Sequence, residues 1–123
     1  MSLRSRSRRM VLAGAMVLVL HPRPGEAHAI LEASEPASGA RIPPGPVVLK
    51  LRYNSRIDRA RSRLSLTQPD LTRVTVPIDP EGPPDLLTAA VTLTPGAYIV
   101  RWQVLAVDGH ITRGDVAFFV TEH

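Results

Sequence analysis

The sequence predicts an all-β protein: a small antiparallel β-sandwich or Greek-key barrel of about seven short strands. Short runs in which apolar and polar side chains alternate recur through residues 28–123. Turns rich in proline, glycine, aspartate and asparagine separate these runs, and the whole chain holds 12 prolines and 8 glycines. No part of this region repeats its apolar residues with the 3.6-residue period of a helix. The region is the right size for one domain with one core, and it contains no internal repeat.

The strands are expected, in chain order, at residues 29–34, 47–53, 63–67, 73–76, 86–93, 98–106 and 116–120. The first is a short apolar opening that suits a sheet edge. In the second, apolar side chains at alternate positions share one face, while Lys50 and Arg52 lie on the other. Turns are expected between residues 35 and 46, and the arginine-rich stretch 54–62 is expected to be a solvated loop.

The last two strands carry most of the aromatic residues of the domain. Trp102, the only tryptophan, stands in the middle of the 98–106 run among apolar neighbours, and we expect it to fill the core. A loop is expected through residues 112–114. In the final strand, Val116, Phe118 and Val120 share one face, which predicts that this face is buried.

Residues 1–27 are predicted to be a cleaved secretory signal peptide, so that residues 28–123 form the exported domain. Four arginines lie within the first nine residues, and residues 10–20 form an uncharged apolar run. Such a run is too short to span a bilayer and is typical of a signal-peptide core. Small residues at Gly25 and Ala27 favour cleavage after Ala27, and a competing frame cuts after Ala29. Both the general secretory and the twin-arginine route remain open.

Removal of this segment changes the electrostatics of the protein. Residues 1–27 hold five of the 15 basic and one of the 11 acidic residues, so the exported domain carries ten of each. The basic excess therefore belongs to the export signal, and we expect no nucleic-acid partner. The chain has no cysteine, and all three methionines lie within residues 1–27. Any metal on the exported domain must be bound by nitrogen and oxygen ligands.

Asp108 and His110 stand two positions apart at the end of the 98–106 strand. In extended chain, residues i and i+2 point to the same side, so the carboxylate and the imidazole can aim at one point. Gly109 between them adds no side chain and allows the backbone to bend. Taken alone, such a pair is more often a simple hydrogen-bonded pair than a functional site.

Cleavage after Ala27 would make His28 the first residue of the exported chain. Its α-amine and its Nδ1 could then close a six-membered chelate ring on one metal ion, which would displace the amine proton. An imidazole from His110 and an oxygen from Asp108 would complete a set of three nitrogens and one oxygen. This donor set favours Cu(II), although the order of metal affinities does not exclude Zn(II).

Three groups of residues resemble the motifs of a known family. They are the opening His28-Ala29-x-Leu31-x-x-Ser34-x-Pro36, the strand positions Val48, Leu51 and Tyr53, and a C-terminal signature made of Leu93-x-Pro95-Gly96-x-Tyr98-x-Val100-x-Trp102, Val107-Asp108-Gly109-His110, Gly114 and Phe118-x-Val120. Together they are similar to the CopC family of periplasmic copper-binding proteins, which is associated with copper resistance and copper handling. The resemblance implies a cupredoxin-like, Ig-like β-barrel in the periplasm. It also implies one Cu(II) per chain at His28, Asp108 and His110, and a membrane copper transport protein as partner.

Two departures from the family pattern carry information. Some members hold Cu(I) through a methionine-rich loop, and the exported domain here has no methionine. Some members place a glutamate near the Cu(II) site at the end of the second strand, where Ser55 stands in this chain. We therefore expect a protein with a Cu(II) site and no Cu(I) site.

Two other functions remain open from the sequence. An amine-and-imidazole chelate completed by a second histidine also occurs in copper enzymes that cleave polysaccharides oxidatively, although Asp108 as a ligand would favour Cu(II) and oppose redox cycling. The fold alone would also permit an Ig-like interaction module in which His28 and His110 have no metal. We expect a monomeric copper-binding protein rather than an enzyme. His123, the last residue, could join the site only if the C-terminus folded back.

Overall fold

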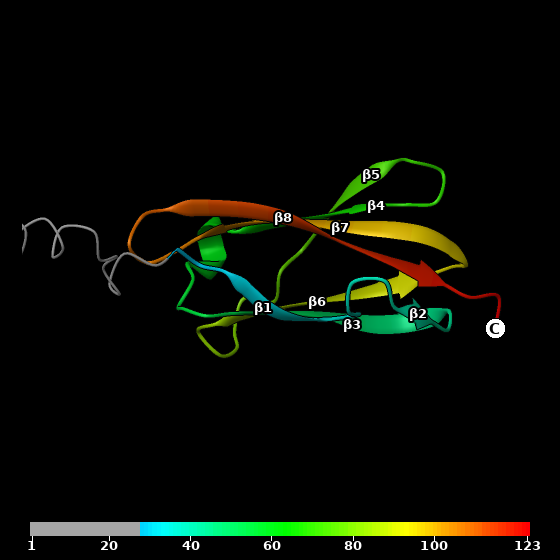
Figure 1. The fold of residues 1–123 in the computed structure, drawn as a ribbon, viewed down its shortest axis with the longest axis horizontal. Coiled ribbons are helices and arrows are strands. Elements are labelled where there is room, and N and C mark those ends of the chain that lie inside the picture. Colours follow the sequence, from blue (N-terminus) through cyan, green and yellow to red (C-terminus); the bar gives the residue numbers. More distant parts are fainter. Residues whose placement is uncertain (1–27) are drawn as a thin grey trace, which may run out of the picture.

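In the computed structural model, which describes residues 28–123, the chain forms two β-sheets packed face to face (Figure 1). The smaller sheet has the strand order β1 (Leu31–Glu35), β3 (Gly45–Tyr53) and β6 (Leu86–Leu93). The larger has the order β2 (Arg41–Ile42), β8 (Ile111–Val120), β7 (Gly96–Leu105), β4 (Arg63–Thr67) and β5 (Arg73–Val76). The predicted all-β sandwich is confirmed. The predicted signal peptide, residues 1–27, lies outside the described residues.

The core lies between the two sheets and follows the alternation of the strands. In β3, Leu49, Leu51 and Tyr53 are buried while the residues between them are exposed. Trp102 on β7 is 7% exposed and meets the Tyr53 ring edge to face, with ring centroids 5.3 Å apart. The prediction that Trp102 fills the core is therefore confirmed, and the Trp102–Tyr53 contact joins the two sheets.

The strand count differs from the predicted seven because β2 is an eighth strand within a stretch expected to be a turn. This two-residue strand runs parallel to β8, and all the other strand pairs are antiparallel. Backbone bonds from Phe119 to Ala40 and from Thr121 to Ile42 hold it in place. A strand of two residues is too short to show alternation, so no sequence pattern could reveal it.

The predicted loop at residues 112–114 is wrong, because β8 begins at Ile111 and pairs with β7 over its full length. The reason is the contact between Gly114 and Trp102, which face each other across the two strands. The indole lies so close to Gly114 that a Cβ there would overlap it. The glycine therefore makes room for the tryptophan instead of ending the strand.

The loop between β3 and β4 is ordered by one turn of 3-10 helix, Arg59–Arg61. From this loop, the Arg59 side chain donates hydrogen bonds to the backbone oxygens of Pro83 and Leu86, near the start of β6. Ile57 is buried and forms a β-bridge with Ala106, which ties this loop to the end of β7. Within residues 28–123, no helix is long and apolar enough to cross a membrane.

Candidate metal centre

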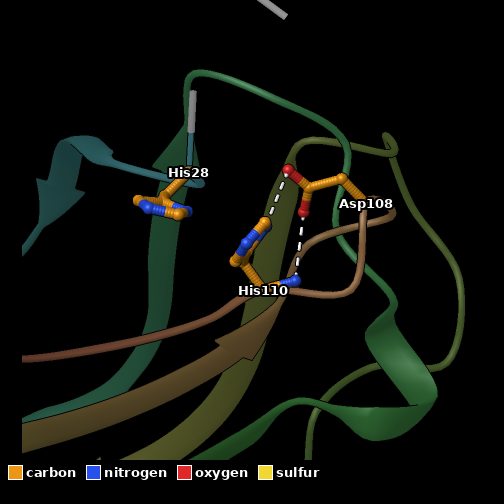
Figure 2. A group of neighbouring side chains, drawn as sticks. All are labelled: His28, Asp108 and His110. Atoms are coloured by element: carbon orange, nitrogen blue, oxygen red, sulfur yellow. Dashed lines mark hydrogen bonds and ion pairs between the residues drawn. The ribbon is translucent and has the colours of Figure 1, made fainter. Parts of the chain in front are cut away.

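His28, Asp108 and His110 lie together at one end of the sandwich, where β7 ends and β8 begins (Figure 2). Each offers a ligand atom, and these atoms all lie within 4.8 Å of one another. All three residues are exposed, so an ion could reach them from solvent. The structure thus brings together the three residues that the sequence suggested as ligands, although His28 and His110 lie 82 positions apart in the sequence.

A tight turn, rather than an extended strand, brings Asp108 and His110 together. Ala106 donates a backbone hydrogen bond to His110 and the Gly109 amide donates one back to Ala106, at 2.8 and 2.9 Å. Gly109 has a φ of +93°, in the left-handed region that favours glycine. The two side chains converge, as predicted. Of the two backbone conformations that the sequence allowed, the structure has the bend at Gly109 and not the extended chain, because the strand ends before Asp108.

Both carboxylate oxygens of Asp108 engage His110. The His110 amide donates to Oδ1 at 3.1 Å, and His110 Nδ1 lies 3.2 Å from Oδ2. The backbone bond, followed by the side-chain bond, holds the pKa of Asp108 below its usual range. A carboxylate has about four lone-pair sites, so two bonds to His110 leave capacity for a metal. The contact also orients the imidazole, as carboxylates do for histidine ligands in metal proteins.

His28 approaches from the segment that leads into β1. Its ring centroid lies 4.5 Å from that of His110, with the ring planes inclined by 67°. His28 is exposed, whereas Ala29 beside it is 1% exposed and belongs to the core. Burial of Ala29 therefore anchors the segment and leaves the His28 side chain at the surface beside the turn.

Several hydrogen bonds connect neighbouring segments at this end of the sandwich. Asn54 is bonded to Ile30 through both its backbone and its side chain, and Thr112 donates from Oγ1 to the Ala29 oxygen. On the other side, the Val107 amide donates to the Arg56 oxygen. The N-terminal segment is thus flanked by the β3–β4 loop on one side and by β8 on the other.

His123, the other histidine considered in the sequence, lies away from the cluster. It follows β8 at the C-terminal end, which Figure 1 shows at the opposite end of the sandwich from the first described residue. In this structure the C-terminus therefore does not fold back to the cluster. Ser55 Oγ is buried and has no hydrogen-bond partner among the described residues.

The roles of Asn54 and Thr112 beside the cluster could not be read from the sequence. Both fall in stretches that were expected to be loops, and neither belongs to a motif with metal-ligand chemistry. Their roles follow from tertiary contacts alone, since Asn54 reaches the segment after His28 from the loop that follows β3 and Thr112 reaches it from β8. Single side-chain bonds of this kind produce no periodic pattern in the sequence.

The fold and the cluster agree with comparisons to known proteins. A family model of the CopC domain matches residues 31–121. Protein YobA of Escherichia coli strain K12 is 31% identical over 98 residues, which cover 76% of this chain and 79% of YobA. CopC from Methylosinus trichosporium OB3b is 28% identical, with a TM-score of 0.68 over 76% of this chain and 94% of that chain.

A second solved structure is similar in fold alone: PcoC, a copper resistance protein from Escherichia coli, has 20% identity and a TM-score of 0.64 over 75% of this chain and 99% of that chain. The CopC match contains Asp108 and His110 and begins three residues after His28. Since that match spans nearly all of the described residues and YobA is more than 30% identical, the chain belongs to the CopC family.

Proposed function

We propose that this protein binds one Cu(II) ion in the periplasm, through His28, Asp108 and His110, for copper sequestration, resistance or delivery to a membrane copper transport protein. The observation that carries the proposal is the convergence of two imidazoles and a carboxylate within 4.8 Å on a CopC domain. Two solved structures of similar fold are both of PcoC, which is described as a copper resistance protein from Escherichia coli. Copper is the cargo of such a site and takes no part in a reaction.

The chemistry of the donors favours Cu(II) among common metals. Imidazole nitrogen and carboxylate oxygen suit a tetragonal Cu(II) centre, and first-row divalent metals bind such ligands most tightly at copper. Asp108 remains ionised well into the acid range because its pKa is lowered, so it supplies a negative charge that favours Cu(II) over Cu(I). Residues 28–123 contain no methionine or cysteine, which leaves this region without the soft ligands that Cu(I) prefers.

The proposed site is completed by export. Removal of residues 1–27 gives His28 a free α-amine, and that amine together with Nδ1 of the same residue chelates the ion. Full affinity therefore belongs to the processed chain and not to the precursor. Such coupling would keep the protein from holding copper tightly before it reaches the compartment in which it acts.

Copper titration of histidine variants tests this proposal. We expect His28→Ala and His110→Ala each to weaken Cu(II) binding by at least about tenfold, because each removes a nitrogen ligand from a small set. Competition with a chelator of known affinity, on processed protein recovered from the periplasm, measures the loss. His123→Ala is the matched control, since that exposed histidine lies at the opposite end of the sandwich (Figure 1). Equal affinities for wild type and both site variants would contradict the assignment.

A further inference from the structure

The peptide group between Ala29 and Ile30 is held by two side chains at once. Thr112 Oγ1 donates to its carbonyl oxygen at 2.8 Å, and its N–H donates to Asn54 Oδ1 at 2.8 Å. Asn54 makes a further bond, in which its backbone N–H donates to the Ile30 backbone oxygen at 3.0 Å. The two residues are attached to different sheets. Asn54 directly follows β3 of the smaller sheet, and Thr112 lies on β8 of the larger sheet.

This clamp lies immediately after His28 and before the first regular strand. Strand β1 begins at Leu31, so the regular β1–β3 ladder does not order residues 28–30. The first residues of a domain are usually poorly ordered unless something ties them down. Burial of Ala29 and the two side-chain bonds supply that restraint.

Thr112 also connects the N-terminal segment directly to the other half of the metal cluster. It stands two residues after His110 on the same strand, and its hydroxyl bonds to the residue next to His28. This hydrogen bond between their neighbours therefore helps to fix the distance between the two histidines. Ligands held in the productive geometry before the ion arrives lose less freedom on binding.

We propose that Asn54 and Thr112 are positioning residues that hold His28 against the Asp108–His110 turn and thereby raise the affinity for copper. The inference rests on the proposed function, because it assumes that His28 is a ligand. Neither Asn54 nor Thr112 is a proposed ligand of the ion. Each fixes the backbone that carries the amine and the imidazole of His28.

The opposite end of the sandwich provides a matched control. There Thr121 Oγ1 lies 2.8 Å from the His123 oxygen and 3.2 Å from the Ile42 oxygen, so a threonine hydroxyl again bonds to backbone oxygen. This hydroxyl is remote from His28, His110 and Asp108, as the positions of β2 and the C-terminus in Figure 1 show. Its loss removes a threonine-to-backbone hydrogen bond without touching the copper site.

The test uses processed protein and compares Thr112→Val, which keeps the side-chain shape, with Thr121→Val. We expect Thr112→Val to weaken Cu(II) binding about tenfold, as changes around metal ligands commonly do. Thr121→Val should bind copper like wild type, and Thr112→Ser should restore the affinity because it restores the hydroxyl. Asn54→Ala, which removes the clamp from the other side, should show the same loss as Thr112→Val.

A second measurement on metal-free protein separates the clamp from the metal. The heteronuclear NOE of the Ile30 amide should fall in Asn54→Ala and Thr112→Val, and stay at the wild-type value in Thr121→Val. Failure of wild type to bind copper would overturn the proposed function, while the Ile30 measurement would still report whether the clamp exists. Tight copper binding by wild type with equal affinity in Thr112→Val and Asn54→Ala would overturn the positioning role. An equal loss in Thr112→Val and Thr121→Val would do so as well.

Discussion

Gly109 sets the geometry of the turn that joins Asp108 to His110. Its φ of +93° is costly for any residue with a Cβ, and the space around a Cβ there is open. Conformation alone therefore decides what this position accepts. The same turn carries both bonds between the Asp108 carboxylate and His110, so a change in the Gly109 backbone alters both potential ligands together.

We expect Gly109→Ala to destabilise the fold by about 1–2 kcal/mol, the usual cost of the left-handed conformation for an L-residue. Copper affinity should fall in the same variant, because the turn relaxes and separates Asp108 from His110. Gly109→Asn is the control, since asparagine tolerates this conformation better than alanine. Urea unfolding measures the first effect and chelator competition the second. If alanine and asparagine behave alike, the turn does not depend on the backbone of this residue.

At the scale of single residues, the sequence revealed the chemistry more completely than the geometry. His28, Asp108 and His110 could be singled out because residue type and spacing carry their chemistry, and the structure places them together. Their role as ligands stays a prediction. The sequence allowed a bend at Gly109, and the structure shows one. The bonds from Asn54 and Thr112 could not be foreseen, because they depend on where the neighbouring strands lie.

At the scale of elements, the β7–β8 pair supports the site. These two strands pair from Gly96↔Val120 to Leu105↔Ile111, and the turn with Asp108 closes the far end of that hairpin. Trp102 packs across Gly114 within the hairpin, so the register and the core packing depend on each other. A shift of one residue would place the indole against a side chain instead of a glycine.

Gly114→Ala tests this coupling. The added methyl group would overlap the Trp102 indole, and overpacking of this kind costs about 1–3 kcal/mol. We expect a lower unfolding midpoint in urea and a changed fluorescence spectrum, because Trp102 is the only tryptophan. Asp115→Ala, one position away and facing outward, should leave the spectrum at the wild-type wavelength. A Gly114→Ala protein with wild-type stability and spectrum would contradict the packing described.

The elements that sequence patterns predicted well are those with long alternation. Strands β3 and β7 each bury one parity over nine or more residues, and their positions were expected from that pattern. Strand β6 was expected only as a strand-like run closed by a turn. Two features were missed, β2 and the first part of β8. The first has only two residues, and the second begins with Ile111 exposed and contains a glycine that looks like a turn signal.

At the scale of the whole molecule, the fold brings together two segments that are far apart in the sequence. His28 and His110 are separated by 82 positions, yet their rings are 4.5 Å apart. The sandwich achieves this because the segment before β1 lies beside the start of β8, joined by the Thr112–Ala29 bond. The proposed metal centre is therefore a property of the complete fold and of the processed N-terminus.

In the proposed metal centre, Cu(II) is bound by the amine and imidazole of His28 together with the imidazole of His110. All three nitrogens in this arrangement belong to histidine, because the amine is that of His28 itself. Electron paramagnetic resonance of the copper-loaded, processed protein reports the number of ligand nitrogens through their hyperfine couplings. Comparison of unlabelled protein with protein labelled with 15N in histidine alone shows which residues supply them.

We expect three nitrogen couplings, all of which change on 15N-histidine labelling, in a protein whose N-terminus is His28 by mass spectrometry. Fewer than three couplings, or a coupling that labelling leaves unchanged, would contradict it.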